Sequence, residues 1–360
     1  MYLILTRSFP PEVGGMQNLM WGLCNSLSKY YKIKVFADYH KNCEIYDKKV
    51  SHEIERVRGF KFLRKYRKSY IANEFIKKND NIYGIIADHW KSLELIKTNK
   101  KKICLIHSKE INHEKGTSLN KRVLNVLNNV DYVVSNSNFT KNLATNCGVD
   151  PNKIVVINPG INPVSNISNE ALNEANYLLK NKEQILITVS RFDKRKNHEK
   201  IIMALRNLKE IYPNIFYICI GYGDEEKNIK KLVKELRLDK HVIFFRDISQ
   251  DLKNALISMS NIFVMPSIIH KKSVEGFGIS YVEAAQYGVP SIGGKDGGAS
   301  DAIDHQKTGL ICDGNSLEEI YSSINEMLKN NKYLEYGKNA KKKAVSFYWD
   351  NIIEKYKKIL

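Results

Sequence analysis

A chain of 360 residues exceeds the usual size of one folded domain, so its length predicts two domains. Hydrophobic residues make up 43% of the chain and charged residues 27%, which is typical of a folded soluble protein and excludes a disordered one. No segment approaches the roughly 20 apolar residues that would cross a bilayer, and the first residues do not resemble a signal peptide, so we expect a cytoplasmic location. The six scattered cysteines lack zinc spacing and are expected to be reduced and buried.

The net charge of +18 is concentrated in the first half of the chain. Residues 1–163 contain 27 Lys and Arg against 14 Asp and Glu, whereas residues 164–360 contain 30 against 25. The densest part is RVRGFKFLRKYRK, residues 56–68, where cations alternate with apolar and aromatic residues. This pattern predicts peripheral contact with an anionic membrane surface at the inner face of the cell membrane, although a solvated basic loop has the same composition. An RNA-contacting patch is a third interpretation, but no nucleic-acid module accompanies it, so we expect no nucleic-acid partner.

Short apolar runs alternate with segments of helical period, which is typical of βαβ units and a parallel sheet. The predicted strands are residues 2–6, 33–37, 83–87, 102–107, 131–135 and 153–158, and then 185–190, 215–221, 241–245, 261–266, 289–294 and 308–312. The predicted helices are residues 15–30, 118–129, 197–211, 224–237, 249–259, 316–330 and 333–359. The pattern predicts an α/β protein with two Rossmann-like, doubly wound parallel-sheet domains in tandem.

The polar, asparagine-rich segment 158–184 separates the two series and is predicted to be the hinge. We expect a first domain over residues 1–163 and a second domain over residues 164–345. Residues 346–360 are expected to form a C-terminal helix that packs back toward the first domain. Because ligands bind outside the carboxyl ends of parallel strands, the predicted site is a cleft across which the two sheets face each other.

The first candidate loop is PPEVGGMQ, residues 10–17, between a strand and a helix. Gly14 and Gly15 would let the backbone approach a ligand and offer N–H groups to an anion. A plain tight turn would contain the same residues, so both interpretations stay open.

SRFDKRKN, residues 190–197, follows the first strand of the second domain. Arg191 and Lys196 can project from the strand end, and a guanidinium fork with an ammonium group is suited to bind a diphosphate and stabilise it as a leaving group. Their neighbours Lys194 and Arg195 are expected to be solvated. A basic turn on the surface is the alternative for the whole segment.

Two more loops follow strands of the second domain. GYGDEEKNIKKL, residues 221–232, contains the G-x-G of Gly223 but lacks the third glycine of the dinucleotide fingerprint. RDISQDL, residues 246–252, contains Ile248 and is expected to line a pocket for the base.

The stretch EGFGISYVE, residues 275–283, carries two glutamates eight residues apart. Gly276 and Gly278 disfavour helix before Ile279, so Glu275 is predicted on a loop and Glu283 on a helix. Eight helical residues span about 12 Å, which fits a glycosidase carboxylate pair at about 5 to 9.5 Å poorly. The spacing instead favours two polar ends of an extended ligand site, with the backbone amides of Phe277, Gly278 and Ile279 facing a phosphate between them.

SIGGKDGGASDAI, residues 291–303, adds another glycine-rich loop before a helix. The chain contains no D-x-D sequence, which is the common carboxylate device for holding a metal on a sugar nucleotide. We therefore expect no metal and no cofactor.

Together these segments resemble the retaining nucleotide-sugar glycosyltransferases of family 4, which have the GT-B fold of two Rossmann-like domains. The resemblance is most specific in the second half, through Glu275, Glu283, Arg191 and Lys196, and PPEVGGMQ, IHSKE, SNSNFTKNL and VINPGIN are weaker counterparts in the first half. IIHKKS before Glu275 and the GGKDGGASDAI form are most similar to the phosphatidylinositol mannosyltransferase and exopolysaccharide branch.

The resemblance implies that the domain over residues 1–163 binds the acceptor and that the domain over residues 164–345 binds the nucleotide sugar. It also implies roles for individual residues. Glu275 would hydrogen-bond hydroxyls of the donor hexose and Glu283 those of the ribose. Arg191 and Lys196 would hold the diphosphate, with Gly15 nearby, and His107 would reach the sugar and acceptor, although a lone histidine is more often structural. Asn158-Pro159-Gly160 and Asn197 depart from the usual pattern without touching the charged residues.

The sequence therefore predicts a retaining, metal-independent enzyme that moves a hexose from a UDP- or GDP-sugar to a glycan or lipid-linked acceptor in cell-envelope synthesis. The alternatives on the same fold are a sugar-nucleotide epimerase and a glycan phosphorylase. A noncatalytic basic lipid-binding protein is the alternative from a different class.

Overall fold

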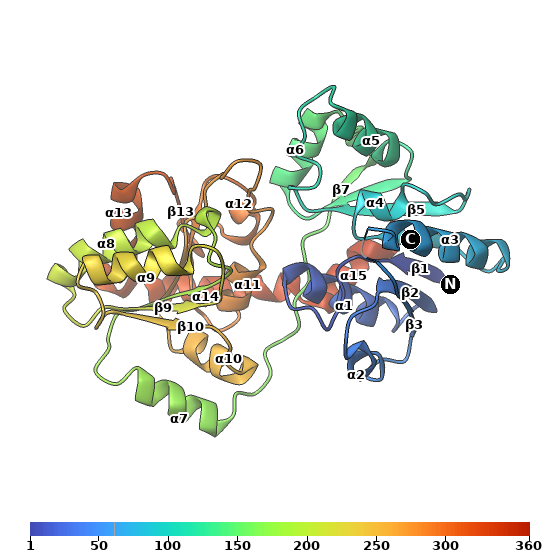
Figure 1. Ribbon diagram of the computed structural model, residues 1–360. Helices are drawn as coiled ribbons and strands as arrows, with labels where there is room; N and C mark the ends of the chain where they lie inside the picture. The colour runs from blue at the N-terminus through green and yellow to red at the C-terminus, as the bar shows by residue number, and fades with distance from the viewer. Residues whose placement is uncertain (61) are drawn as a thin grey trace. The chain divides into compact units, whose positions relative to one another are not determined.

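The computed structural model describes residues 1–60 and 62–360. They form two compact units: unit 1 comprises Met1–Asn162 and Phe347–Leu360, and unit 2 comprises Pro163–Ser346. Each unit contains a parallel sheet whose strands are connected through helices (Figure 1). The predicted fold class, two doubly wound α/β domains, is confirmed.

In unit 1 the strand order is β3-β2-β1-β4-β5-β6-β7. The strands are β1 (Tyr2–Leu5), β2 (Ile33–Asp38), β3 (Glu53–Val57), β4 (Gly84–Ala87), β5 (Lys101–Ile106), β6 (Tyr132–Ser135) and β7 (Ile154–Val156). The helices are α1 (Gly15–Leu27), α2 (Cys43–Asp47), α3 (Arg64–Lys77), α4 (Trp90–Leu93), α5 (Ser118–Leu127), α6 (Asn138–Cys147) and α15 (Trp349–Lys357), with the 3-10 turn η1 (Pro151–Lys153).

In unit 2 the strand order is β10-β9-β8-β11-β12-β13. The strands are β8 (Ile185–Val189), β9 (Phe216–Ile220), β10 (Val242–Phe245), β11 (Ile262–Met265), β12 (Ser291–Gly294) and β13 (Gly309–Cys312). The helices are α7 (Asn169–Leu178), α8 (His198–Ile211), α9 (Glu226–Glu235), α10 (Gln250–Ser258), α11 (Ile279–Ala285), α12 (Ala299–Ala302), α13 (Leu317–Leu328) and α14 (Lys332–Ala344), with the 3-10 turns η2 (Lys194–Lys196), η3 (Lys329–Asn331) and η4 (Val345–Phe347), which ends across the boundary in unit 1.

The central strands of both sheets are buried on both faces. Every residue of β1, β4, β9, β11 and β12 is buried. Such strands are continuous apolar runs because helices cover the sheet on each side, and this is why they could be located from the sequence. In the described part of the chain, the cysteines are buried and unbonded, and no helix is long and apolar enough to cross a bilayer.

The predicted hinge, residues 158–184, is wrong for most of its length. The chain passes into unit 2 at Pro163, and α7 occupies Asn169–Leu178 within that unit. The hydroxyl of Ser168 caps the helix by accepting from the backbone N–H of Ala171, and Ala171 and Ala175 are buried one turn apart. The segment was predicted as a hinge because its composition is polar, but it contains an amphipathic helix whose buried side is formed by small residues.

The predicted single helix over residues 333–359 is also wrong, because it is interrupted between Ala344 and Trp349. At the interruption Ile161 and Tyr348 form a parallel bridge: the N–H of Ile161 donates to the carbonyl of Phe347, and the N–H of Trp349 donates to the carbonyl of Ile161. The bridge requires extended backbone at Tyr348, which ends one helix before the next begins.

α15 is part of the core of unit 1. Trp349, Ile352, Ile353 and Tyr356 are buried in the same apolar cluster as residues of β1, β2 and α1. The indole of Trp349 lies directly on Gly22 of α1, where an added Cβ would be 2.2 Å from its Nε1. The last residues of the chain therefore complete the core formed by the first.

Candidate active site

The carboxyl ends of β8, β11 and β12 lie side by side at one edge of the sheet of unit 2. β8 pairs with β11, and β11 pairs with β12, in parallel. The segments that follow these strands, residues 190–197, 266–278 and 295–298, therefore leave the sheet at the same edge.

Glu275 lies at the centre of a buried ionic cluster at this edge. Nη1 of Arg195 donates a hydrogen bond of 2.6 Å to Oε2 of Glu275, and Nζ of Lys196 donates to the same oxygen. The three side chains are only 10 to 12% exposed. Lys196 also lies 3.3 Å from Sδ of Met265. The carboxylate of Asp193 lies 3.7 Å from Arg195 and 3.4 Å from the exposed Arg191. With these two residues included, three cations face two carboxylates, and the excess of positive charge favours the approach of an anion.

The expectation that Arg195 is solvated is wrong, whereas Lys194 is exposed. Both residues lie in η2, which ends at Asn197 in the left-handed region. The side-chain amide of Asn197 donates to the carbonyls of Pro266 and Gly314 and so fastens the turn to the loop after β11. This attachment directs Arg195 and Lys196 inward.

The ionisation of Glu275 is set by two opposing effects. Burial would raise its pKa, but the charges and hydrogen bonds of Lys196 and Arg195 outweigh burial and hold the pKa at about 2. Burial lowers the pKa of Lys196, and the carboxylate of Glu275 opposes this effect. Glu275 is thus an anion that can only accept hydrogen bonds.

Glycines of the neighbouring loops allow the backbone of Glu275 to be held closely. Gly297 forms a parallel bridge with Glu275, and the N–H of Gly298 donates to the Glu275 carbonyl at 2.8 Å. Gly297 has φ +124, and an added Cβ would lie 2.4 Å from that carbonyl oxygen. A side chain at this position would therefore displace Glu275.

The prediction for EGFGISYVE is confirmed in its local structure, because Glu275 precedes α11 and Glu283 lies within it. Gly276, Phe277 and Gly278 are buried and Ile279 begins the helix. Gly278 has φ +86, and an added Cβ would lie 2.3 Å from the ring of Tyr281. The Tyr281 hydroxyl in turn donates to the carbonyl of Met265 at 2.6 Å, which ties α11 to the end of β11.

Glu283 is half-buried on α11, one turn before Tyr287. Burial raises the pKa of Tyr287 to about 12, with further contributions from the charges of Glu283 and Asp251. The charges of both carboxylates therefore act on the same phenol. The hydrogen bonds that join Arg195, Lys196 and Glu275 do not include Glu283.

Arg191 lies outside the buried cluster. Its side chain is 71% exposed, and its guanidinium is 3.4 Å from the carboxylate of Asp193. Arg191 follows the same strand as Lys196, so the sequence located both residues correctly at the strand end but did not predict their different burial.

Gly223 follows β9, which pairs with β8, and Ile248 follows β10, which pairs with β9 at the edge of the sheet. Gly223 packs against the backbone of Phe192, where an added Cβ would lie 2.3 Å from the Phe192 carbonyl oxygen. Ile248 is half-buried and precedes Ser249, whose hydroxyl caps α10. Both loops are at the carboxyl edge predicted for them.

In unit 1, His107 follows β5 and is half-buried. Its Nε2 lies 3.2 Å from the carbonyl oxygen of Asp88, and its backbone N–H donates to Glu110. The carboxylate of Asp88 accepts from the backbone N–H groups of Arg7 and Ser8 at 2.7 and 3.1 Å. Asp88 thus joins the segments that follow β1, β4 and β5 at one edge of this sheet.

Gly14 and Gly15 stand at the start of α1. Gly14 has extended backbone, and an added Cβ would meet only the flexible side chain of Gln17, 2.6 Å away. The local packing alone would therefore accept a side chain at Gly14 with a small rearrangement.

Sequence reasoning missed Arg195 and Asp88. Arg195 was expected to be solvated, and nothing near it in the sequence indicates its partner Glu275, which is 80 residues away. Asp88 directly follows a predicted strand, so the rule that points to polar residues at strand ends would have found it. No group of three or more His, Cys, Asp or Glu side chains within residues 1–60 and 62–360 is arranged to hold a metal ion.

Comparisons with known proteins agree with the fold. Residues 13–164 match the family described as Glycosyltransferase Family 4, and residues 169–343 match the Glycosyl transferases group 1. The fold and these matches define an enzyme, a glycosyltransferase of the GT-B type. The chain belongs to the glycosyltransferases that join a Family 4 domain to a group 1 domain.

Relatives cover most of the chain at low identity. A protein of Mycolicibacterium smegmatis described as a "GDP-mannose-dependent alpha-(1-6)-phosphatidylinositol monomannoside mannosyltransferase" is 23% identical over 346 residues, 91% of this chain and 88% of that protein. The "N-acetyl-alpha-D-glucosaminyl L-malate synthase" of Bacillus anthracis is 28% identical over 186 residues, 51% of this chain and 46% of that protein. Among solved structures, Anabaena HepE in complex with UDP has a TM-score of 0.83 at 18% identity and covers 99% of this chain and 98% of its own.

Proposed function

We propose that the protein is a retaining, metal-independent glycosyltransferase that moves a hexose from a UDP- or GDP-sugar to a glycan or lipid-linked acceptor. The observation that carries this proposal is the buried cluster of Arg195, Lys196 and Glu275 at the carboxyl edge of unit 2. Together with Arg191 and Asp193 beside it, this edge contains three cations and two carboxylates. The Anabaena structures with UDP and UDP-glucose and the GDP-mannose-dependent relative support a nucleotide-sugar donor.

In this proposal the cluster divides the work of donor binding. Lys196 and the more exposed Arg191 hold the diphosphate and stabilise the charge that develops on it as it leaves. Glu275, held ionised by Arg195 and Lys196, accepts hydrogen bonds from hexose hydroxyls. Glu283 binds the ribose hydroxyls. The contacts of Lys196 and Arg191 with the diphosphate strengthen as negative charge moves onto it. These contacts therefore lower the barrier rather than only binding the substrate.

For the acceptor we propose unit 1, with His107 reaching the sugar and acceptor. We propose that the departing diphosphate takes the proton of the attacking hydroxyl on the same face of the hexose. The proton passes to the oxygen that leaves C1, and the new glycosidic bond keeps the configuration of the donor. Gly14, Gly15, Gly223, Ile248 and residues 276–279 are proposed to contribute backbone contacts to the donor.

We also propose a setting in cell-envelope polysaccharide or glycolipid synthesis, on the inner face of the membrane. The basic excess of unit 1 and the lipid named as the substrate of the mycobacterial relative support this. The noncatalytic alternative is not retained, because both halves of the chain match glycosyltransferase families.

The test is a panel of UDP- and GDP-hexoses assayed for slow hydrolysis of the donor, which requires no knowledge of the acceptor. We expect one donor to be hydrolysed and Lys196→Ala or Glu275→Ala to reduce the rate by 100-fold or more. Lys194→Ala and Glu199→Ala are matched controls, because both side chains are exposed. Wild-type rates in Lys196→Ala or Glu275→Ala would refute the proposed roles.

Three further readouts test the remaining parts of the proposal. The rate should be unchanged by EDTA, and the released sugar should form first with the anomeric configuration of the donor. Sugar phosphate released only in the presence of inorganic phosphate, without a nucleotide, would instead identify a phosphorylase. Conversion of the donor into an epimeric sugar nucleotide would identify an epimerase.

A further inference from the structure

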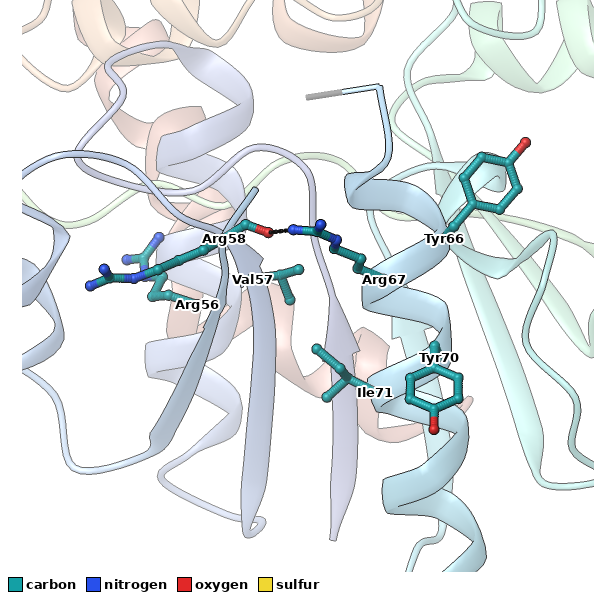
Figure 2. Close-up of a pocket in the computed structure, with 7 residues that line it drawn as sticks. All are labelled: Arg56, Val57, Arg58, Tyr66, Arg67, Tyr70 and Ile71. Carbon is teal, nitrogen blue, oxygen red and sulfur yellow. Dashed lines mark hydrogen bonds between the residues drawn. The ribbon is translucent and has the colours of Figure 1, made fainter. Parts of the chain in front are cut away.

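A groove opens in unit 1 where β3 ends and α3 begins (Figure 2). It has a volume of about 640 Å³ and is lined by Arg56, Val57, Arg58, Tyr66, Arg67, Tyr70 and Ile71. β3 runs parallel to its neighbours, so the groove lies at the same carboxyl edge of the sheet as the loop of His107. β3 and β5 are four strand positions apart, which corresponds to roughly 19 Å.

Most cations of the basic run around this groove are already paired with acids from other segments. Arg56 pairs with Asp47 at 2.6 Å and Lys65 with Glu94 at 2.5 Å. Lys68 is buried and pairs with Asp38 at 2.7 Å, and Arg64 lies 3.8 Å from the same carboxylate. Lys61 lies outside the described residues. The charges of these four cations are therefore partly or wholly neutralised within unit 1.

Arg58 and Arg67 are the exceptions. The Arg58 side chain is 72% exposed, with its nearest carboxylate, Glu44, at 3.9 Å. Arg67 makes no ion pair with any described residue and donates from Nη1 to the carbonyl of Arg58 at 3.2 Å, as Figure 2 shows. Both arginines line the groove, so two guanidinium groups with little or no internal neutralisation adjoin one cavity.

Gly59 makes the position of Arg67 possible. Its φ is +107, and an added Cβ would lie 1.7 Å from Nη1 of Arg67. The guanidinium therefore rests directly on the backbone at Gly59, which holds it in place before any ligand binds. A residue with a side chain here would be strained and would displace the guanidinium.

Aromatic side chains surround the two arginines. Phe60 and Phe62 are 70% and 74% exposed and stack with ring centroids 5.9 Å apart. Tyr66 and Tyr70 are also exposed. Several exposed aromatic rings within one short segment mark an interaction surface rather than ordinary surface variation. Rings of this kind beside arginines are suited to the boundary between lipid head groups and acyl chains.

We propose that this groove binds the head-group phosphate of an anionic phospholipid, with Arg58 and Arg67 contacting the phosphate and Phe60 and Phe62 entering the interfacial layer. This inference rests on the proposed function, because it supplies the membrane side of a lipid-linked acceptor. Nucleic acid fits less well: binding to it depends on neutralising many successive phosphates, and here two arginines face one groove.

The experiment measures cosedimentation of the full chain with vesicles of phosphatidylcholine alone or with 30 mol% phosphatidylglycerol. We expect binding that requires the anionic lipid. It should weaken about 30-fold in Arg58→Gln/Arg67→Gln, because each cation near the surface contributes roughly a fivefold factor. Arg206→Gln/Arg237→Gln removes the same charge from exposed arginines of unit 2 and should bind as the wild type does. Gly59→Ala should weaken binding in the same direction as loss of Arg67.

Further arms separate the sources of phosphate and the two proposals. Phe60→Ser/Phe62→Ser should lose vesicle binding but keep any thermal shift caused by inorganic phosphate. A phosphate-induced shift that needs both arginines, without vesicle binding, would overturn the lipid proposal, as would equal vesicle binding by the arginine and control variants. The lipid proposal would also be overturned if RNA displaced the wild type from the vesicles and if RNA binding were lost in Arg58→Gln/Arg67→Gln. Donor hydrolysis should persist in Arg58→Gln/Arg67→Gln. If the wild type hydrolyses no donor, the proposed function is refuted, whereas the proposal that the groove binds lipid is still decided by the vesicle measurements.

Discussion

Arg195 and Glu275 form a buried pair in which Nη1 of the arginine donates to Oε2 of the glutamate at 2.6 Å. Because Lys196 donates to the same oxygen, Arg195 has a positioning role: it holds the carboxylate in place and keeps it ionised. The pair joins the turn after β8 to the loop after β11, so the orientation of Glu275 depends on both segments.

Replacing Arg195 should therefore change the ionisation of Glu275 as well as the rate. In Arg195→Met the pKa of Glu275 should rise by about 1 unit or more, because one of two adjacent positive charges is lost. In the pH profile of donor hydrolysis, the loss of activity on the acidic side should therefore occur at a higher pH. Arg195→Lys should restore most of the wild-type profile. An unchanged acidic limb in Arg195→Met would show that the arginine acts only through packing.

Glu275 should also make the stability of the fold depend on pH. Its pKa is about 2 in the folded protein and near 4.5 when unfolded. A lowered folded-state pKa stabilises above the unfolded value, and the stabilisation is lost as the pH falls from about 4.5 toward 2. The loss should approach about 3 kcal/mol. Urea unfolding of the wild type and Glu275→Gln at pH 6, 4 and 3 measures it as the shrinking difference between the two proteins; a constant difference would contradict it.

Asp88 should anchor the segment after β1. Asp88→Ala removes the acceptor of the Arg7 backbone N–H and one of the two acceptors of the Ser8 backbone N–H, and we expect a loss of about 3 kcal/mol of stability. Hydrogen exchange of the peptide covering residues 6–9 should accelerate at least tenfold. Asp88→Asn retains an acceptor oxygen and serves as the control, with exchange close to that of the wild type. Unaltered protection in Asp88→Ala would show that another group holds the segment.

The contact between Gly22 and Trp349 should control the stability of unit 1. Gly22→Ala places a Cβ against the indole and should cost about 1 to 3 kcal/mol. Trp349→Ala should cost about 3 to 5 kcal/mol through the cavity it leaves. Because phenylalanine leaves room at this contact, the cost of Gly22→Ala should fall in a Trp349→Phe background. Denaturant unfolding of the wild type, Gly22→Ala, Trp349→Phe and the double variant checks this. If the two single changes in the free energy of unfolding add up to that of the double variant, the two residues do not interact.

The sequence predicted the central strands of both sheets to within one or two residues, because strands buried on both faces are continuous apolar runs. It missed β3, whose residues EIERV are charged at three of five positions and of which only Val57 is buried. The pattern belongs to the edge of the sheet, where one side is open to solvent. Local composition located the buried centre of each domain but not its margin.

The candidate site was predicted in the same uneven way. The loop position of Glu275 and the helical position of Glu283 followed from glycines close to them in the sequence, and both are confirmed. The partners of the charged residues were not predictable, because Arg195 meets Glu275 and Lys68 meets Asp38 through the tertiary fold. A run of cations in a sequence therefore says little about how much of its charge faces the solvent.

The core of unit 1 contains residues from both ends of the chain, with Trp349, Ile352, Ile353 and Tyr356 packed among strands and helices formed before residue 162. In the sequence, all residues of unit 2 stand between these two segments of unit 1, and unit 2 has its own apolar cluster. The residues of unit 1 that are translated first therefore cannot complete their apolar core until Trp349–Tyr356 have been synthesised, after every residue of unit 2.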